Sequence, residues 1–264
     1  MQMDLGLKNK ISIVTGASRG IGRECAIELA KEGSTVLITA RNEELLSKTV
    51  SGIEKEGGNA DFVSADLSNH QGCKSVVDTC IEKFGSVDIL VNCAGAAKGG
   101  DILDLDVSLI DDALGLKSYG YLRLAQMVIP YMKKKKWGRI VNVAGGAGTS
   151  PTRRNIPTSL ANITILNMTR AISDAVAGEG ILINTVCPGM TNTQRARDIY
   201  EPQAKKEGRD VEDILSKLGS SLPAGRICEP EEVGPVVAFL SSEKCSYVFG
   251  SSIYMDGGAR RSTP

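Results

Sequence analysis

The sequence contains a single histidine, one tryptophan and only 4% aromatic residues among its 264 positions. His70 stands in a polar stretch beside Asn69 and Gln71, and this setting favours a solvated loop residue over a metal ligand or a catalytic base. The seven cysteines are scattered singly, with no Cys-x-x-Cys pair. This spacing excludes the usual zinc motifs and indicates a reduced chain instead of a disulfide framework. We therefore expect no metal site.

The sequence also lacks net charge and long apolar runs. Lys plus Arg and Asp plus Glu both number 31, so no basic surface for nucleic acid or acidic membranes is expected. The run 133–136 of four lysines follows an apolar helical pattern, where cations suit a helix C-terminus. Neither an apolar signal core in residues 1–10 nor an apolar window of 18 residues is present. These features predict a cytoplasmic protein without a membrane segment.

Short β-branched runs alternate with longer amphipathic segments along the whole chain. This alternation predicts an α/β protein: a single Rossmann domain over residues 1–264, with a doubly wound, seven-stranded parallel sheet and helices on both faces. The expected strands are Ile11–Thr15, Thr35–Ala40, Ala60–Ser64, Val87–Asn92, Arg139–Val143, Ile181–Cys187 and Ser251–Met255.

The segment from Gly189 to Arg226 breaks this alternation. It is polar, contains glycines and prolines, and carries two short helical patterns. An insertion of this length after a strand is usually functional, and in a parallel sheet it rises where ligands bind. We expect a substrate lid at about residues 190–224.

A glycine-rich turn follows the first expected strand and opens the first helix. It reads Thr15-Gly16-Ala17-Ser18-Arg19-Gly20-Ile21-Gly22. Glycines allow a tight turn, and a helix N-terminus presents free N–H groups to a pyrophosphate. The expected dinucleotide contacts in this turn are Gly16, Ser18, Arg19, Gly20, Ile21 and Gly22.

Four further motifs follow later strands in a fixed order. They are Asp66-Leu67, Asn92-Cys93-Ala94-Gly95, Pro188-Gly189-Met190-Thr191-Asn192-Thr193 and Asp256-Gly257-Gly258. Together with the glycine turn, they resemble the short-chain dehydrogenase/reductase family over nearly the whole chain, and in particular its 3-oxoacyl-ACP-reductase-like members. The resemblance implies that Asp66 holds the adenine, that Asn92 and Gly95 support the cofactor wall, and that Thr193 contacts the nicotinamide amide. It adds Leu67, Ala94, Asn162, Pro188, Gly189 and Thr191 to the cofactor site.

The end of the second strand bears on which dinucleotide binds. An NAD site needs an acid there for the ribose 2′-hydroxyl, whereas this chain has Ala40 followed by Arg41. Arg41 and Arg19 suit a 2′-phosphate through charge-assisted hydrogen bonds. NADP is therefore the expected cofactor, in preference to NAD.

The resemblance fails where the family has its chemistry. Family members use an Asn, a Ser, a Tyr and a Lys: the Tyr donates the proton, the Lys lowers its pKa, the Ser binds the substrate oxygen and the Asn anchors a water. No tyrosine occurs between Tyr131 and Tyr200. Aligned by their flanks, the four positions hold Lys117, Gly145, Thr158 and Asn162. A threonine hydroxyl is a poor general acid near neutral pH, so ordinary carbonyl reduction should be very weak.

The Asn and Lys of the family stand exchanged here, as Lys117 and Asn162. Two interpretations stay open: the Lys117 ammonium enters the space at Asn162, or Lys117 points to solvent and the pair is a coincidence. Lys117, Thr158 and Asn162 are the candidate catalytic residues. Tyr119 and Tyr121 are expected in a core or interface. The residues that could reach the substrate from loops, or else be solvated, are Arg153, Arg154 and Tyr200.

Two hypotheses follow. The first is an NADP(H)-dependent enzyme acting on a small alcohol, ketone or related molecule with replaced machinery, including a non-redox lyase or hydrolase on the same fold. The second is a non-catalytic NADP-binding sensor or structural subunit. Under both, the family resemblance and two helices that are apolar on more than one face predict a homo-oligomer, a tetramer. The apolar positions are Leu122, Leu124, Ala125, Val128, Ile129, Ile163, Ile165, Leu166 and Met168.

Overall fold

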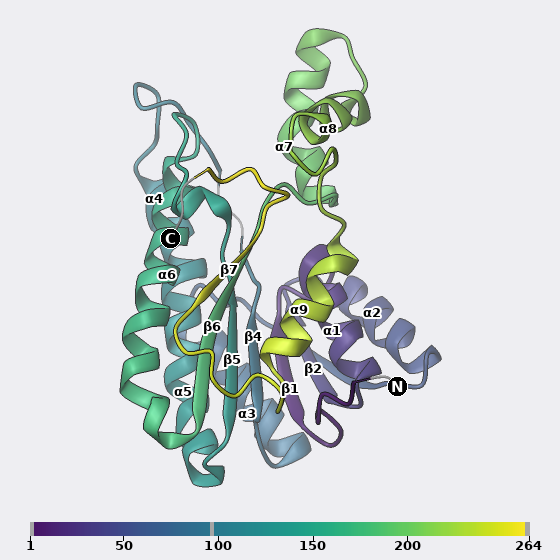
Figure 1. The fold of residues 1–264 in the computed structure, drawn as a ribbon, viewed down its shortest axis with the longest axis vertical. Coiled ribbons are helices and arrows are strands. Elements are labelled where there is room, and N and C mark those ends of the chain that lie inside the picture. The colour runs from purple at the N-terminus through teal and green to yellow at the C-terminus, as the bar shows by residue number, and fades with distance from the viewer. Residues whose placement is uncertain (1–2, 96–97, 262–264) are drawn as a thin grey trace.

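Seven parallel strands form one sheet in the order β3-β2-β1-β4-β5-β6-β7 within residues 3–95 and 98–261, the part of the chain that the computed structural model describes (Figure 1). This confirms the expected Rossmann-like fold. The strands are β1 (Ile11–Thr15), β2 (Thr35–Ala40), β3 (Asn59–Ser64), β4 (Ile89–Asn92), β5 (Gly138–Val143), β6 (Ile181–Pro188) and β7 (Ser252–Met255).

The central strands are buried on both faces. Every residue of β4, β5 and β6 is buried, as expected when helices cover a parallel sheet on each side. The strand order reverses between β1 and β4. At such a switch point, neighbouring connections leave the sheet in opposite directions and open a crevice at the carboxyl ends.

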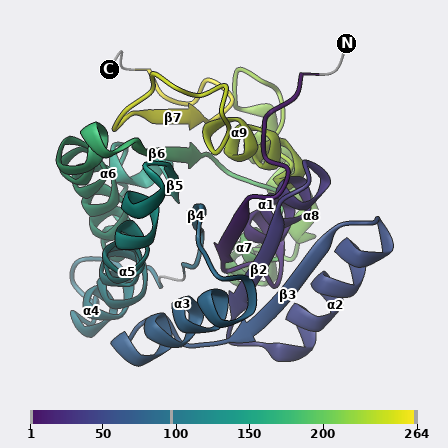
Figure 2. The same cartoon turned by 90° about the horizontal axis from the view of Figure 1, so that it is seen from below.

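Two helical layers cover the sheet (Figure 2). Helices α1 (Gly20–Lys31), α2 (Glu43–Lys55) and α9 (Val233–Leu240) lie on one face, where α1 packs on α9. On the other face, α3 packs on α5. That second layer comprises α3 (His70–Phe84), α4 (Ser108–Ala113), α5 (Gly120–Lys135) and α6 (Ile156–Val176), with a π-helical segment Leu114–Tyr119 joining α4 to α5.

His70 is exposed, but it begins α3 instead of lying in a loop, because Asn69 caps the helix by accepting the N–H of Gly72. The lysine run closes α5 as expected, and Lys133 and Lys135 form ion pairs with Glu179 and Asp88. No helix in the described residues is long and apolar enough to span a membrane.

The segment after β6 forms two helices that extend beyond the carboxyl edge of the sheet (Figure 1). These are α7 (Gln194–Glu207) and α8 (Val211–Ser220), which pack on each other. Arg197 of α7 holds Glu212 of α8 through a nitrogen–oxygen contact of 2.6 Å. The excursion coincides with the expected lid segment and stands over the switch point.

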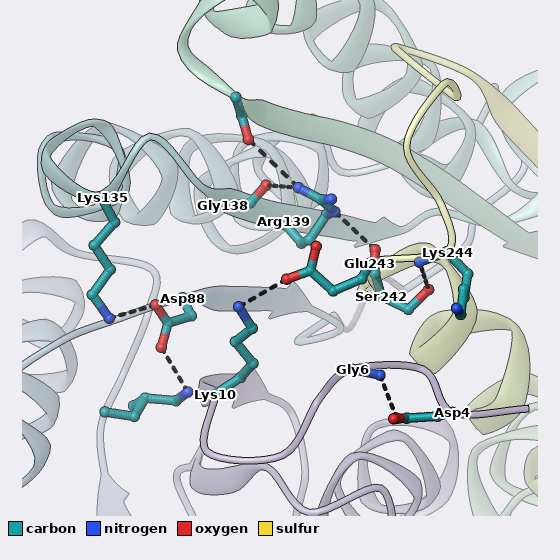
Figure 3. Close-up of polar contacts among 12 residues, drawn as sticks. Asp4, Gly6, Lys10, Asp88, Lys135, Gly138, Arg139, Ser242, Glu243 and Lys244 are labelled. Atoms are coloured by element: carbon teal, nitrogen blue, oxygen red, sulfur yellow. Dashed lines mark hydrogen bonds and ion pairs between the residues drawn. The ribbon is translucent and has the colours of Figure 1, made fainter.

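A polar cluster lies at the opposite, amino edge of the sheet (Figure 3). Asp88 accepts the backbone N–H of Ile11 at 2.9 Å and pairs with Lys135 at 2.6 Å. The buried Arg139 donates to the carbonyl of Ser242, and its guanidinium lies 4.5 Å from the Trp137 ring centre. These contacts join the starts of β1 and β5 to the segment after α9.

Candidate active site at the carboxyl edge

The glycine turn between β1 and α1 approaches the end of β4 very closely. Gly16 has φ +66°, and a Cβ there would lie 2.8 Å from Ala94 Cα. A Cβ on Gly22 would lie 2.4 Å from the carbonyl oxygen of Gly16. Thr15 ties the two strand ends together, because its hydroxyl accepts the N–H groups of Cys93 at 2.9 Å and Ala94 at 3.0 Å.

The N-terminus of α1 has the features of a phosphate site. Arg19 occupies the N-cap without a side-chain capping hydrogen bond, and no acidic residue lies in the first turn. The first N–H groups of the helix and its positive dipole end are therefore available to an anion. Ser18, Gly20 and Ile21 belong to this turn, so the residues present fit the pyrophosphate of a dinucleotide.

The ends of β2 and β3 form the neighbouring side of the crevice. Arg41 follows β2 and Asp66 follows β3, and both are exposed, while Leu67 is buried. The Ser68 backbone N–H, donated at 3.0 Å, holds the pKa of the Asp66 carboxyl below its usual range, with a smaller contribution from Arg41. Arg19 faces the other way, with its guanidinium 3.9 Å from Asp198 of α7.

The far wall of the crevice comes from β4, β5 and β6. Asn92 at the end of β4 donates to Asn142 Oδ1 at 2.9 Å, and Asn142 donates to Thr169 of α6 at 2.8 Å. This buried chain holds the strand ends in register. After β6, Thr193 caps α7 by accepting the N–H of Ala196.

The segment from Pro188 to Thr193 also meets the glycine turn. The methyl group of Thr193 lies 3.3 Å from where a Cβ on Gly20 would be. Thr191 is buried, and its hydroxyl donates to the carbonyl of Gly189 at 3.1 Å. The residues expected to hold the cofactor therefore gather at one edge of the sheet, although their individual contacts with a dinucleotide stay predictions.

Three of the four positions that align with the family's catalytic residues meet beside this crevice. Lys117 Nζ donates to Asn162 Oδ1 at 2.6 Å, and the backbone N–H of Gly145 donates to the same oxygen at 2.9 Å. Of the two interpretations of Lys117, the one in which it points to solvent is wrong. The ammonium occupies the space beside Asn162.

The π-helical segment Leu114–Tyr119 carries Lys117 to this place. A π-helix inserts an extra residue per turn and re-aims the side chains around it, often at functional sites. The Lys117 stem crosses Gly95, where a Cβ would lie 3.3 Å from Lys117 Cδ and Cε. The glycine thus leaves room for the lysine stem. Nothing in the pattern of residues 114–119 marks a π-helix, so sequence reasoning missed it.

Burial is the main cause that lowers the pKa of Lys117, to about 8. The positive charge of Arg195 lowers this pKa further, because like charges disfavour the ammonium. The neighbouring thiols of Cys93 and Cys187 would oppose the shift only as thiolates. Burial raises the pKa of each thiol to about 12, so both are neutral where Lys117 titrates. Lys117 therefore exchanges a proton near physiological pH.

Thr158 and the tyrosines are less suited to proton transfer. Thr158 lies one turn before Asn162 on α6 and is half-buried. Tyr121 is buried in the core, as expected, with its hydroxyl donating to the Val143 carbonyl at 3.2 Å, and burial raises its pKa. Tyr119 is 52% exposed. Burial also raises the pKa of Tyr200 on α7.

An open cavity of about 560 Å³ lies between α7 and the loops after β4 and β5. Of the two loop arginines, Arg154 lines it, whereas Arg153 lies outside and pairs with Asp101 at 2.6 Å. Sequence reasoning missed most of the lining, because it comes from segments far apart in the chain. The lining residues are Arg19, Lys98, Gly99, Gly100, Asp101, Arg154, Arg195, Asp198 and Ile199. In the described residues, no three His, Cys, Asp or Glu side chains are placed to hold a metal ion.

Comparison with known families and proteins agrees with this geometry. The family model described as Enoyl-(Acyl carrier protein) reductase matches residues 16–260. A curated 3-oxoacyl-[acyl-carrier-protein] reductase from Thermotoga maritima is 32% identical over 254 residues, which cover 96% of this chain and 98% of the relative.

Two solved structures are similar over nearly their full length. L-sorbose reductase from Gluconobacter frateurii, complexed with NADPH and L-sorbose, superposes with a TM-score of 0.93 at 27% identity, covering 97% of this chain and 98% of the other. Actinorhodin polyketide ketoreductase with NADPH gives a TM-score of 0.90 at 31% identity, covering 95% and 97%.

Proposed function

Because this chain belongs to the short-chain dehydrogenase/reductase family, we propose that it is an NADP(H)-dependent oxidoreductase acting on a small carbonyl or alcohol compound through a replaced active site. The observation that carries the proposal is the convergence of Lys117 Nζ and Gly145 N on Asn162 Oδ1, beside the dinucleotide crevice. The Lys117 ammonium is partly buried there and keeps a hydrogen-bond partner, as a charge removed from water requires.

The cofactor half of the proposal rests on the glycine turn and on Arg41. The open N-terminus of α1 and the close approach of Gly16 to Ala94 suit a pyrophosphate. The reductase and ketoreductase structures above were both determined with NADPH. Arg41, at the end of β2 where this chain has no acid, would hold the 2′-phosphate.

Lys117 is proposed as the acid that replaces the family tyrosine. When bound, NADPH supplies a hydride to the carbonyl carbon. The Lys117 ammonium then donates its proton to the carbonyl oxygen, and in the reverse direction the neutral amine accepts it. A pKa of about 8 suits this exchange, because the best general acid titrates near the working pH. The ordinary lysine pKa of about 10.4 would make proton release slower.

Asn162 is proposed to bind the same carbonyl oxygen in place of the family serine. Its Oδ1 accepts two N–H groups, so the amide orientation is set by its partners and the Nδ2 donors face the other way. Nδ2 lies 3.0 Å from where a Cβ on Gly145 would stand, the direction from which a serine hydroxyl would reach. The missing side chain at Gly145 leaves that space to the Asn162 amide, and in the proposal the substrate oxygen binds beside it. Such a donor is typically worth about 100–1000-fold in rate.

The test is NADPH oxidation with a panel of ketones, diketones and ketoesters, using wild type, Lys117→Met and Asn162→Ala. A Thr164→Val variant serves as the matched control on the same helix, because the Thr164 hydroxyl donates to the Leu160 carbonyl one turn earlier. We expect turnover that falls at least about 100-fold in both site variants and changes little in the control, with NADPH affinity retained in Lys117→Met and in the control. Tight NADPH binding without turnover of any compound would contradict the proposal and favour the sensor or structural subunit.

A further inference from the structure

The cavity above the proposed site is lined by more positive than negative charge. Four of its side chains are cationic, from Arg19, Lys98, Arg154 and Arg195, and two are acidic, from Asp101 and Asp198. Both acids are engaged: Asp101 pairs with Arg153 from outside the cavity, and Asp198 accepts from Gln194 at 3.0 Å and lies near Arg19. The field inside the cavity is therefore positive.

The cations stand on opposite walls. Lys98 and Arg154 lie on the loops after β4 and β5, and Arg154 forms no ion pair with any described residue. Arg195 stands on α7 across the cavity, where burial and the nearby charge of Arg19 lower its pKa and the charge of Asp198 opposes that shift. Asp198 offsets part of the repulsion between the Arg19 and Arg195 guanidinium groups, and a bound anion between the walls would offset more of it.

Two elements that line the cavity also lead toward the proposed reacting groups, which do not themselves line it. The backbone N–H of Gly100 donates to the Arg154 carbonyl at 3.1 Å, which fixes Arg154 just before α6. Asn162 lies six residues after Ile156, the first residue of α6, which is about 9 Å along the helix at 1.5 Å per residue. Arg195 lies near enough to Lys117 for its charge to lower the lysine pKa.

We propose that this cavity binds an anionic group of the substrate, so that the enzyme acts on carbonyl compounds carrying a carboxylate or phosphate several bonds from the reacting carbon. Arg154 holds that group from the loop before α6, and Lys98 and Arg195 add to the attraction. This inference rests on the proposed function, since it assigns the substrate class of the same site. A single charge-assisted contact is worth about tenfold in affinity or more.

The anion held here could also be a phosphate of the cofactor, because Arg19 belongs to the glycine turn. The two sources are separated by keeping the cofactor bound. With the protein saturated by NADP⁺, no ketone is reduced and the cofactor phosphates already occupy their own positions. A substrate anion then binds to the complex, whereas an anion that occupies only the cofactor phosphate position is displaced by NADP⁺.

The experiment is calorimetric titration of the NADP⁺ complex with 5-oxohexanoate and with its neutral methyl ester. We expect the acid to bind at least about tenfold more tightly than the ester, and Arg154→Ala to abolish this difference. Asp101→Asn should increase the preference for the acid, because it removes a negative charge from the lining. Lys206→Gln is the control, since it removes a cation from the exposed face of α7 and should leave the preference unchanged.

Equal binding of acid and ester by the wild type would overturn the inference, as would a preference that Arg154→Ala leaves intact. Loss of acid binding whenever NADP⁺ is present would also overturn it and assign the anion to the cofactor. None of these readouts requires turnover. An inactive protein that still prefers the acid in an Arg154-dependent way would contradict the proposed reaction but not the anion site, and the two failures are therefore distinguishable.

Discussion

Replacing Asn162 by aspartate should raise the pKa of Lys117, and the size of the increase follows from one contact. Lys117 Nζ lies 2.6 Å from Asn162 Oδ1, so Asn162→Asp places a carboxylate oxygen where the amide oxygen stands. At an effective dielectric constant of about 20, two unit charges at that distance interact by about 6 kcal/mol. Even a quarter of this interaction energy would raise the pKa of Lys117 by about one unit.

In the wild type, the reaction rate should depend on pH through the protonation of Lys117. With a pKa of about 8, roughly 90% of Lys117 is protonated at about pH 7 and roughly 10% at about pH 9. Carbonyl reduction needs the ammonium, so its rate should fall about tenfold between those values. Oxidation of the alcohol needs the neutral amine and should rise over the same interval. In Asn162→Asp, the fall in reduction should occur at least one pH unit higher, although the overall rate drops because the Nδ2 donor is lost.

A second assay reports Lys117 without any substrate. Competitive acetylation of the protein at a series of pH values, read by mass spectrometry at the Lys117 peptide, gives the lysine pKa itself. The result should be about 8 in wild type and clearly higher in Asn162→Asp, with exposed Lys217 as an internal reference. A wild-type value at the ordinary lysine pKa, or a reduction rate that does not change across this range, would refute the reasoning.

The lowered pKa also has a consequence for stability. The folded-state pKa lies below the unfolded value, so the folded protein disfavours the ammonium, and this penalty is relieved as pH rises from about 8 to about 10.4. The penalty is up to about 3 kcal/mol. The difference in free energy of unfolding between Lys117→Met and wild type, from urea melts, should therefore shrink as pH rises through that interval.

Four further predictions rest on other parts of the molecule. Arg41→Ala should weaken the binding of NADPH at least about tenfold while leaving the binding of NADH unchanged. The fluorescence of NADPH itself should be measured instead of tryptophan quenching, because Trp137 lies at the opposite edge of the sheet from the cofactor crevice. Asp88→Asn should reduce the free energy of unfolding by about 1–3 kcal/mol in urea melts, without changing NADPH affinity. Sedimentation should give a homotetramer, and a monomer at micromolar concentration would contradict that. The family residues are restored by Gly145→Ser, Thr158→Tyr, Asn162→Lys and Lys117→Asn together, and this variant should have a lower rate of the native reaction. Among the single substitutions, Lys117→Asn should lower that rate most. Thr158→Tyr alone should change it little, because such residues act as a unit.

The burial of the apolar residues on α5 and α6 bears on the tetramer predicted from the sequence. Leu124, Ala125, Val128 and Ile165 are buried within the chain's own core, whereas Ile163 is 41% exposed. An apolar pattern around a helix cannot tell a core contact from a subunit contact, because both remove the same surface from water. The tetramer therefore remains a proposal.

The fold and the cofactor crevice could be predicted from sequence because they depend on near neighbours in the chain. A β-branched run bounded by turns forms a strand, so β1 and β2 begin and end at the expected residues, and the end of β4 is correct although its start is two residues later than expected. The glycine turn likewise follows from steric limits on a few consecutive residues, which Gly16 shows by its positive φ.

The arrangement of the proposed reacting groups was decided only by the tertiary structure. Sequence reasoning found Lys117 and Asn162 but left two orientations open, since 45 residues separate them. The π-helical segment aims the lysine, Gly95 leaves room for its stem, and two donors orient the amide, none of which leaves a local pattern. The same holds for the basic cavity, whose cations come from loops and α7. Which side chains meet across such distances, and how far burial shifts their pKa, depends on how the helices and loops pack on the sheet.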